Sequence, residues 1–264
     1  MAILFNPNTN PKIWYLFEGL LITVFFCSPA ISATIVKPVY KIKLNDTGII
    51  TCSNLTKKNL PCPQKTNPGQ DAQYGRDKTA NNNSDGHAGF SFTKISSTGK
   101  VLLASAKTWN CVKDNVTGLM WEGKTNDGRL HDMDWTYSWY EPNNKINGGF
   151  AGIQNGGLCS TKKDCDTYAY VKAVNKAGWC GHKDWRMPTV EELSSLTSFN
   201  REEPALDITY FPETNIDIFW SSTPYFVSFF SFNNYAWYVN FFRGHENYQI
   251  NAYDYQIRLV RNGQ

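Results

Sequence analysis

The segment 225–256 carries the residue types best suited to ligand recognition, because it is crowded with Tyr, Phe, Asn and Ser. Tyrosine offers rigid amphipathic contact area at low entropic cost, while Asn and Ser offer adaptable hydrogen bonds. Aromatic rings with amide neighbours also suit sugars, which present CH faces and hydroxyl edges. We therefore predict a ligand-binding face that contains Tyr225, Tyr235, Arg243, His245, Asn247 and Tyr253.

The expected roles in this face are ring stacking, hydrogen bonding and, for Arg243, contact with an anionic group. The alternative is a pair of strands whose aromatic side chains alternate into the core. Phe241 and Phe242 are adjacent, so on a strand their side chains face opposite sides of the sheet. One of the two rings must then be covered by another part of the protein.

Signals for catalysis are weak. The sequence has neither a His-Glu-x-x-His pair nor a Gly-x-Ser-x-Gly elbow around its four histidines, which are His87, His131, His182 and His245. Cysteines that are oxidised cannot act as nucleophiles. We therefore predict no catalytic residues and no enzymatic activity.

Two sets of oxygen ligands could bind calcium. Glu141-Pro142-Asn143 matches the triplet of calcium-dependent mannose sites in animal C-type lectins, but the required downstream Trp-Asn-Asp is missing. Asp71, Asp77 and Asp85 could chelate Ca²⁺ in their polar segment. Solvated carboxylates are the simpler interpretation, so we expect no metal and no cofactor.

The N-terminus has the pattern of a secretory signal peptide. Lys12 precedes an apolar run of about 14 residues, and small residues follow it. The run is shorter than the roughly 20 residues that span a bilayer. Cleavage after Ser32 is expected, with cleavage after Ala33 as an alternative and an uncleaved anchor as a second. The mature chain would have no transmembrane span.

Cleavage would reduce seven cysteines to six, and an even number in an exported chain indicates disulfides. Short polar loops favour Cys52 with Cys62 and Cys159 with Cys165, which leaves Cys111 with Cys180. A zinc site is the alternative, but no Cys-x-x-Cys pair supports it.

Composition narrows the class of protein. The 264 residues carry a net charge of +3, with 41% hydrophobic and 15% aromatic residues. This near-neutral balance, with its basic residues scattered, disfavours nucleic-acid binding. Fully disordered, collagen-like and multi-span membrane proteins are excluded. We expect a secreted, periplasmic or cell-surface protein.

The elements that must position the predicted face are short strands and two helices. Capping signals place one helix at 166–177, ending before Gly178, and another after the Thr189–Glu192 capping box, with Leu193, Leu196 and Phe199 buried. Expected strands lie at 39–44, 49–52, 219–223, 236–241 and 256–260, and hairpins at 89–103 and 109–121. Segments 63–89 and 123–164 are expected to be loops. The fold class is α+β with an antiparallel sheet.

Five ordered motifs resemble the C-terminal domain of the Legionella collagen-like adhesin, the Lcl C-terminal domain family. They are CVKDNVTGLMW at 111–121, DWRMPTVEEL at 184–193, FWSST at 219–223, AW at 236–237 and IRLVR at 257–261. Met187 stands where Leu is usual. The resemblance covers about residues 108–262, so we divide the chain into a signal peptide (1–32), N-terminal strands and a polar loop (33–107) and the family domain (108–264).

The resemblance implies an exported protein with a C-type-lectin-like fold, related at a distance to formylglycine-generating enzymes. In the adhesin this domain binds sulfated glycosaminoglycans, but this chain lacks the collagen repeat that precedes it there. We expect an adhesin-like protein that recognises extracellular glycans, with sulfated glycosaminoglycans as one candidate. The alternatives are a module that binds a host or surface protein, and an enzyme of the formylglycine type.

Overall fold

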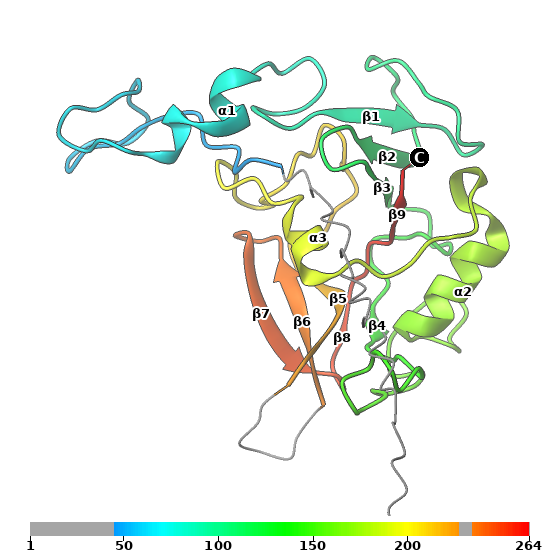
Figure 1. The fold of residues 1–264 in the computed structure, drawn as a ribbon. Helices are drawn as coiled ribbons and strands as arrows, with labels where there is room; N and C mark the ends of the chain where they lie inside the picture. The colour runs from blue at the N-terminus through cyan, green and yellow to red at the C-terminus, as the bar shows by residue number, and fades with distance from the viewer. Residues whose placement is uncertain (1–44, 227–233, 264) are drawn as a thin grey trace, which may run out of the picture. The chain divides into compact units, whose positions relative to one another are not determined.

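The computed structural model describes residues 45–226 and 234–263 (Figure 1). One of its sheets has four antiparallel strands, three from the first half of the chain and one from its end. Its strands are β1 (Phe92–Ile95), β2 (Cys111–Asp114), β3 (Leu119–Glu122) and β9 (Val260–Asn262), in the order β1-β2-β3-β9. The predicted signal peptide, the predicted strand at 39–44 and residues 227–233 lie outside the described residues.

The β2–β3 hairpin confirms the prediction for 109–121. Asp114 shapes its turn, because Oδ1 accepts from the backbone amides of Val116 (2.8 Å) and Thr117 (3.1 Å). Gly118 then adopts φ +78°, which residues with a Cβ rarely adopt.

A second antiparallel sheet contains β5 (Ile218–Tyr225), β6 (Tyr235–Asn240) and β7 (His245–Ile250), in the order β5-β6-β7. Two short strands, β4 (Tyr137–Ser138) and β8 (Asp254–Tyr255), form a third pair. β6 lies between the other two strands of its sheet, and β7 is an edge strand (Figure 1).

The two predicted helices are confirmed. In α2 (Thr167–Ala177), the Asp166 side chain accepts from the amide of Ala169, and Gly178 ends the helix in the left-handed conformation. In α3 (Val190–Ser194), the predicted capping box between Thr189 and Glu192 is complete.

The polar segment before β1 is not all loop. It contains a 3₁₀ turn, η1 (Asp71–Gln73), and a short helix, α1 (Gly75–Thr79). Polar contacts replace apolar packing here: Arg76 Nε donates to the carbonyl of Gly89 (2.9 Å), whose amide donates to Asp77 (2.8 Å). A second 3₁₀ turn, η2 (Trp179–Gly181), follows α2.

Buried aromatic side chains form two core clusters. One packs Trp185 and Trp220 with Tyr170 and Val174 of α2, and the other packs α3 against Trp121, Phe219 and Val239. Trp121, Trp185 and Trp220 are buried, whereas Trp109 and Trp237 are partly exposed.

All three predicted disulfides are present, joining Cys52 to Cys62, Cys111 to Cys180, and Cys159 to Cys165. The zinc alternative is therefore excluded for these six cysteines. Within residues 45–226 and 234–263, no helix has the length and apolar character needed to cross a bilayer.

Several predicted elements are wrong in detail. Residues 49–52 form no strand and contribute only a bridge between Cys52 and Leu60. The first predicted hairpin is reduced to a bridge between Ile95 and Val101, and β1 forms its continuous ladder with β2 instead. The last predicted strand begins at Val260 rather than at 256, and Phe199 is 57% exposed.

Candidate functional site

The β5–β6–β7 sheet carries two of the predicted ligand-binding residues side by side. Tyr225 ends β5 and pairs directly with Tyr235, the first residue of β6. Trp237 lies two positions further along β6 and pairs with Tyr248 of β7. Side chains alternate between the two faces of a strand, so these four rings share one face. We call Tyr225, Tyr235, Trp237 and Tyr248 the aromatic cluster.

Ring geometry shows how tightly the aromatic cluster is packed. The rings of Tyr225 and Tyr248 stack with centroids 3.8 Å apart and planes 7° apart. Tyr235 meets Tyr225 edge-on at 6.4 Å, and Trp237 meets it edge-on at 5.3 Å. The stacked pair therefore stands between two rings of β6, in the geometries that aromatic pairs prefer.

The aromatic cluster is open to solvent and keeps hydroxyl donors. Tyr248 is 40% exposed, and Tyr225, Tyr235 and Trp237 are half-buried. The hydroxyl of Tyr248 beside it raises the pKa of Tyr225, so the Tyr225 hydroxyl stays protonated at neutral pH. The cluster thus presents ring edges and faces with neutral hydrogen-bonding groups at their rim.

The other predicted residues lie elsewhere on the sheet. His245 and Asn247 alternate with Tyr248 along β7, so they face the opposite side from the aromatic cluster. Arg243 lies in the turn before β7, exposed, with its guanidinium 5.2 Å from the Phe242 ring centre. Tyr253 is 53% exposed after β7 and stacks on a neighbouring tyrosine. Of the six predicted residues, only Tyr225 and Tyr235 therefore belong to the aromatic cluster.

Sequence reasoning missed two members of the aromatic cluster. Neither Trp237 nor Tyr248 was among the predicted ligand-binding residues. The two-residue spacing of Tyr235 and Trp237 was a usable signal, because it places both on one face of a strand. The pairing of Tyr248 with Trp237 depends on the β6–β7 register, which the sequence does not show.

The outer edge of β7 is occupied by its own side chains. The amide of Asn251 donates to the carbonyl of Asn234, so the amides of Tyr248 and Ile250 point away from β6. Asn247 Oδ1 accepts from Tyr248 N (2.8 Å), and Gln249 Oε1 accepts from Ile250 N (3.0 Å). Two outward donors of this edge are therefore already bonded.

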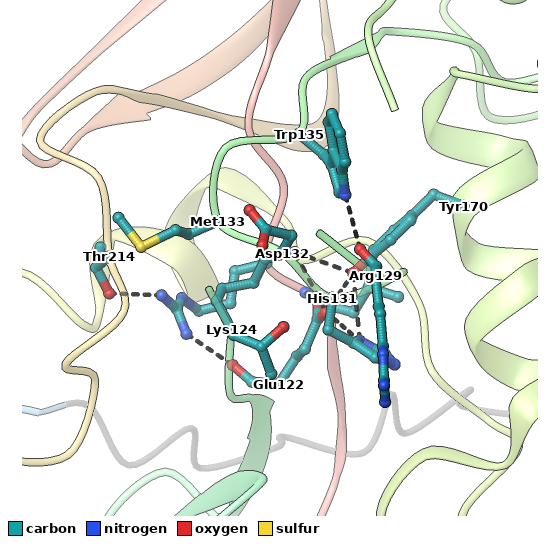
Figure 2. Close-up of polar contacts among 12 residues, drawn as sticks. Glu122, Lys124, Arg129, His131, Asp132, Met133, Trp135, Tyr170 and Thr214 are labelled. Atoms are coloured by element: carbon teal, nitrogen blue, oxygen red, sulfur yellow. Dashed lines mark hydrogen bonds and ion pairs between the residues drawn. The ribbon is translucent and has the colours of Figure 1, made fainter. Parts of the chain in front are cut away.

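A buried network of charged side chains, the charge network, centres on Glu122, the last residue of β3 (Figure 2). Glu122 accepts from His131 Nδ1 (2.8 Å), from the Tyr170 hydroxyl and from the amide of Leu259 (2.9 Å). Lys124 Nζ lies 3.4 Å from Glu122 Oε1 and 3.0 Å from the Tyr170 hydroxyl. The network ties β3 to α2 and to the segment before β9.

Burial and charge act against each other at Glu122. Burial disfavours the ionised carboxylate, but Lys124 and the His131 hydrogen bond outweigh it and lower the pKa of Glu122 to about 2. Burial lowers the pKa of Lys124, although Glu122 opposes this. The side chains of Glu122 and Lys124 are 0% and 2% exposed, so no substrate reaches them in this conformation. The charge network therefore stabilises the fold rather than forming an exposed site.

Arg258 adds a second buried cation. Its guanidinium donates to the carbonyl of Glu122 (2.7 Å) and to Thr214 Oγ1 (2.6 Å), and it lies over the rings of Phe211 and Phe219. Burial lowers the pKa of Arg258 to about 10, so it remains charged at neutral pH. Thr214 and Glu122 are both visible in Figure 2.

Three carboxylates converge at one place in the described residues. One oxygen each from Asp46, Asp71 and Asp77 lies within 4.8 Å of the others, and the Thr47 hydroxyl donates to Asp71 and to Asp77 (3.1 Å). Burial, and secondarily Asp46, raises the pKa of Asp77. The group could hold a cation.

The other predicted calcium ligands are engaged differently. Asp85 accepts from the Ser91 hydroxyl (2.5 Å) instead of joining Asp71 and Asp77. In the Glu141-Pro142-Asn143 triplet, Glu141 Oε1 accepts from the amide of Asn143 (2.9 Å). The Glu141 carboxylate therefore bonds the backbone two residues further along the chain.

Comparison with known proteins gives one match. The family described as the Lcl C-terminal domain matches residues 110–261, from the start of the β2–β3 hairpin to β9. No curated protein and no solved structure matches the chain. The matched residues contain the aromatic cluster, the charge network and two of the three disulfides.

Proposed function

Because this chain belongs to the Lcl C-terminal domain family, we propose that it is an exported, adhesin-like protein that binds an extracellular glycan. The observation that carries the proposal is the solvent-open aromatic cluster on the β5–β6–β7 sheet. We propose a C-type-lectin-like fold on the same family grounds.

Export is supported by the cysteines and by the predicted signal peptide. Disulfides persist in oxidising compartments and are rare in the cytosol. All six cysteines of the described residues are paired. Mass spectrometry of the exported fraction should find a chain that starts at Ala33 and has no reactive thiol. A cytosolic chain with reduced cysteines would overturn this part of the proposal.

The aromatic cluster supports glycan binding through its exposed rings. A sugar can lay its CH face on the ring of Tyr248 while tyrosine hydroxyls bond its edge. Arg243 lies exposed in the β6–β7 turn, at the other end of the sheet from Tyr225 and Tyr235, so it would contact an anionic substituent of a glycan that extends along the sheet. These contacts need no metal.

Two rival functions use the same observations. Tyrosine-rich surfaces also recognise proteins, and the exposed ring of Tyr248 could contact a protein as well as a sugar. A formylglycine-type enzyme would need a reactive thiol, whereas the six described cysteines are oxidised. We therefore propose binding without catalysis.

A glycan array tests the proposal. Retention should be repeated with heparin as competitor at about 0.01 and 0.15 M ionic strength, where the Debye length falls from about 30 to 8 Å. An anionic glycan should lose affinity as salt rises, and a neutral one should not. If no array glycan and no heparin is retained at low salt, glycan binding is wrong and a protein partner becomes the better proposal.

Substitution of Tyr248 assigns the binding to the aromatic cluster. Tyr248→Ala removes the stacked ring and should weaken retention roughly tenfold, because an aromatic contact contributes about 1–1.5 kcal/mol. Tyr248→Phe keeps the ring and should keep most of the affinity. Tyr74→Ala is the matched control, since Tyr74 is 61% exposed and lies far along the chain in another part of the fold. Equal losses in both alanine variants would exclude the cluster.

A further inference from the structure

A short extended segment, residues 100–103, forms the outer edge of the four-stranded sheet. β1 is the first strand in the order β1-β2-β3-β9 (Figure 1), and Ile95 at its end pairs with Val101 in an antiparallel bridge. The Leu102 amide donates to the Lys94 carbonyl (2.9 Å) and thereby points toward β1. The segment therefore extends the sheet beyond β1 by one short stretch of backbone.

The outer backbone groups of this segment are open. Amides alternate in direction along an extended chain, so the amides of Val101 and Leu103 point away from β1 when that of Leu102 points toward it. Within residues 45–226 and 234–263, neither of these two amides nor the Val101 carbonyl is hydrogen-bonded to another backbone group. Unpaired donors and acceptors at a sheet edge are where an extended chain adds as a further strand.

Two exposed apolar side chains accompany the open backbone. Val101 is 70% exposed and Leu103 is 78% exposed. They are two positions apart, so on an extended segment they share one face. A strand that pairs with this edge would place its own side chains beside them and remove apolar area from water. The edge of β7 differs, because there Asn247 and Gln249 already hold two outward amides.

Lysines surround the open edge without an acidic residue among them. Lys100 begins the segment and Lys107 follows the turn after it, and both are exposed. Lys94 is buried beside the same turn, and its Nζ donates to the Ala106 carbonyl (2.9 Å). Burial, and secondarily Lys107, lowers the pKa of Lys94, so these two ammonium groups lie close enough to repel each other. The sequence has no Asp or Glu in 86–113, and within the described part of the chain none of the three lysines forms a salt bridge. The edge therefore attracts an anionic partner.

The segment is held in place from its inner side. The Ala106 amide donates to the Leu103 carbonyl (3.0 Å) and closes the turn that follows the segment. Lys94 fixes the same turn through the Ala106 carbonyl, and its Nζ lies 3.7 Å from the centre of the Trp109 ring. A partner that adds to a pre-formed edge orders few groups of this chain, which favours affinity.

Charge decides which kind of strand can add here. A second copy of this chain would bring its own Lys100 and Lys107 to the same edge, and like charges that face each other across a sheet are destabilising. A strand that carries carboxylates is attracted instead. We propose that residues 100–103 are a docking edge for an extended, acidic peptide segment of a partner protein.

The partner segment adds as a strand along this edge. Its backbone bonds the amide and carbonyl of Val101 and the amide of Leu103, and its apolar side chains cover the two exposed ones. Its carboxylates contact Lys100 and Lys107. The docking edge precedes the residues that match the family and lies on a different sheet from the aromatic cluster, so it does not depend on ligand binding there.

Titration of the ¹⁵N-labelled, disulfide-intact mature chain with the peptide acetyl-Glu-Val-Glu-Val-Glu-Val-Glu-amide tests the proposal by NMR. The amides of residues 100–103 should shift on binding. Those of Val101 and Leu103 should also exchange more slowly with solvent, because they become hydrogen-bonded. Shifts of the same amides on raising the protein concentration without peptide would indicate a second copy as the occupant and overturn the proposal.

Two control peptides separate charge from strand pairing. The peptide with Lys in place of Glu keeps the strand pattern and should bind about tenfold more weakly, because its charge is reversed. The peptide with Pro in place of Val keeps the charge but cannot form a ladder of backbone bonds, so it should also bind about tenfold more weakly. Binding of either control peptide as tight as that of the Glu-Val peptide would contradict the docking edge.

Two paired variants locate the site. Lys100→Gln with Lys107→Gln should weaken binding of the Glu-Val peptide about tenfold, while Lys162→Gln with Lys163→Gln, an exposed pair elsewhere on the chain, should not. Equal losses in the two pairs would show that only net charge matters and would exclude the edge. Tyr248→Ala should leave the peptide shifts unchanged. If Tyr248→Ala abolishes them and the Lys100 and Lys107 variant does not, the docking edge is wrong while the proposed function at the aromatic cluster survives.

Discussion

Replacing Glu122 with glutamine should destabilise the fold more than any exposed charge substitution. The glutamine side chain has nearly the same shape, but it removes the charge that compensates Lys124. It also has one acceptor oxygen where the carboxylate has two, one for His131 and Tyr170 and one for the Leu259 amide. Lys124 would then remain buried with only the weaker attraction of Asp132.

The pKa of Glu122 sets the magnitude. A drop from the ordinary 4.5 to about 2 in the folded state corresponds to about 3 kcal/mol of stabilisation of the ionised form. Removing one partner of a buried ion pair typically costs about 3–5 kcal/mol, which agrees. Because the folded pKa lies below the unfolded one, this contribution is complete above about pH 4.5 and is lost as the pH falls toward 2.

Guanidinium unfolding of the disulfide-intact protein at several pH values measures the effect. At pH 7, Glu122→Gln should lower the free energy of unfolding by about 3 kcal/mol. The difference from the unmodified protein should shrink below pH 4.5, because protonation removes the same charge. Glu202→Gln, at an exposed position, should stay within about 0.5 kcal/mol. A difference that does not change with pH would refute the charge argument, since a packing defect alone would not titrate.

Two further predictions concern stability, each measured by the midpoint of chemical unfolding. Replacing both Cys111 and Cys180 with alanine opens a loop of 69 residues and should lower the free energy of unfolding by about 4 kcal/mol. The same change at Cys52 and Cys62, which are 10 residues apart, should lower it by about 3 kcal/mol. The reverse order would contradict the loop-entropy reasoning. Gly178→Ala should lower the free energy of unfolding by about 1 kcal/mol, because φ is +71° at this position. The nearest atom to the added Cβ is 3.6 Å away, so backbone strain and not a steric clash causes the loss. An unchanged midpoint would exclude that strain.

The elements that could be predicted are those encoded by neighbouring residues. Asp166 and Gly178 mark the two ends of α2 by their own hydrogen bond and backbone angle. The β2–β3 turn is similarly local, because Asp114 caps the amides that follow it. The disulfides followed from loop length alone, since two of them close short segments and leave a single pair over.

The parts that escaped prediction depend on pairings across the chain. Glu122, His131 and Tyr170 come from separate segments, and no local pattern connects them. The aromatic cluster required the register of β7 against β6, which decides that Tyr248 rather than Asn247 faces Trp237. Phe199 kept a helical spacing after Leu196, but α3 ends at Ser194, so its side chain points to solvent.

The bonded outer amides of β7 bear on how copies of this protein behave when crowded. An unpaired edge strand is where neighbouring molecules add to a sheet and grow into ribbons. Asn247 and Gln249 already hold the amides of Tyr248 and Ile250, so a second copy finds two of the donors it needs taken. The β7 edge of this sheet is therefore a poor template for the addition of a strand from a second copy.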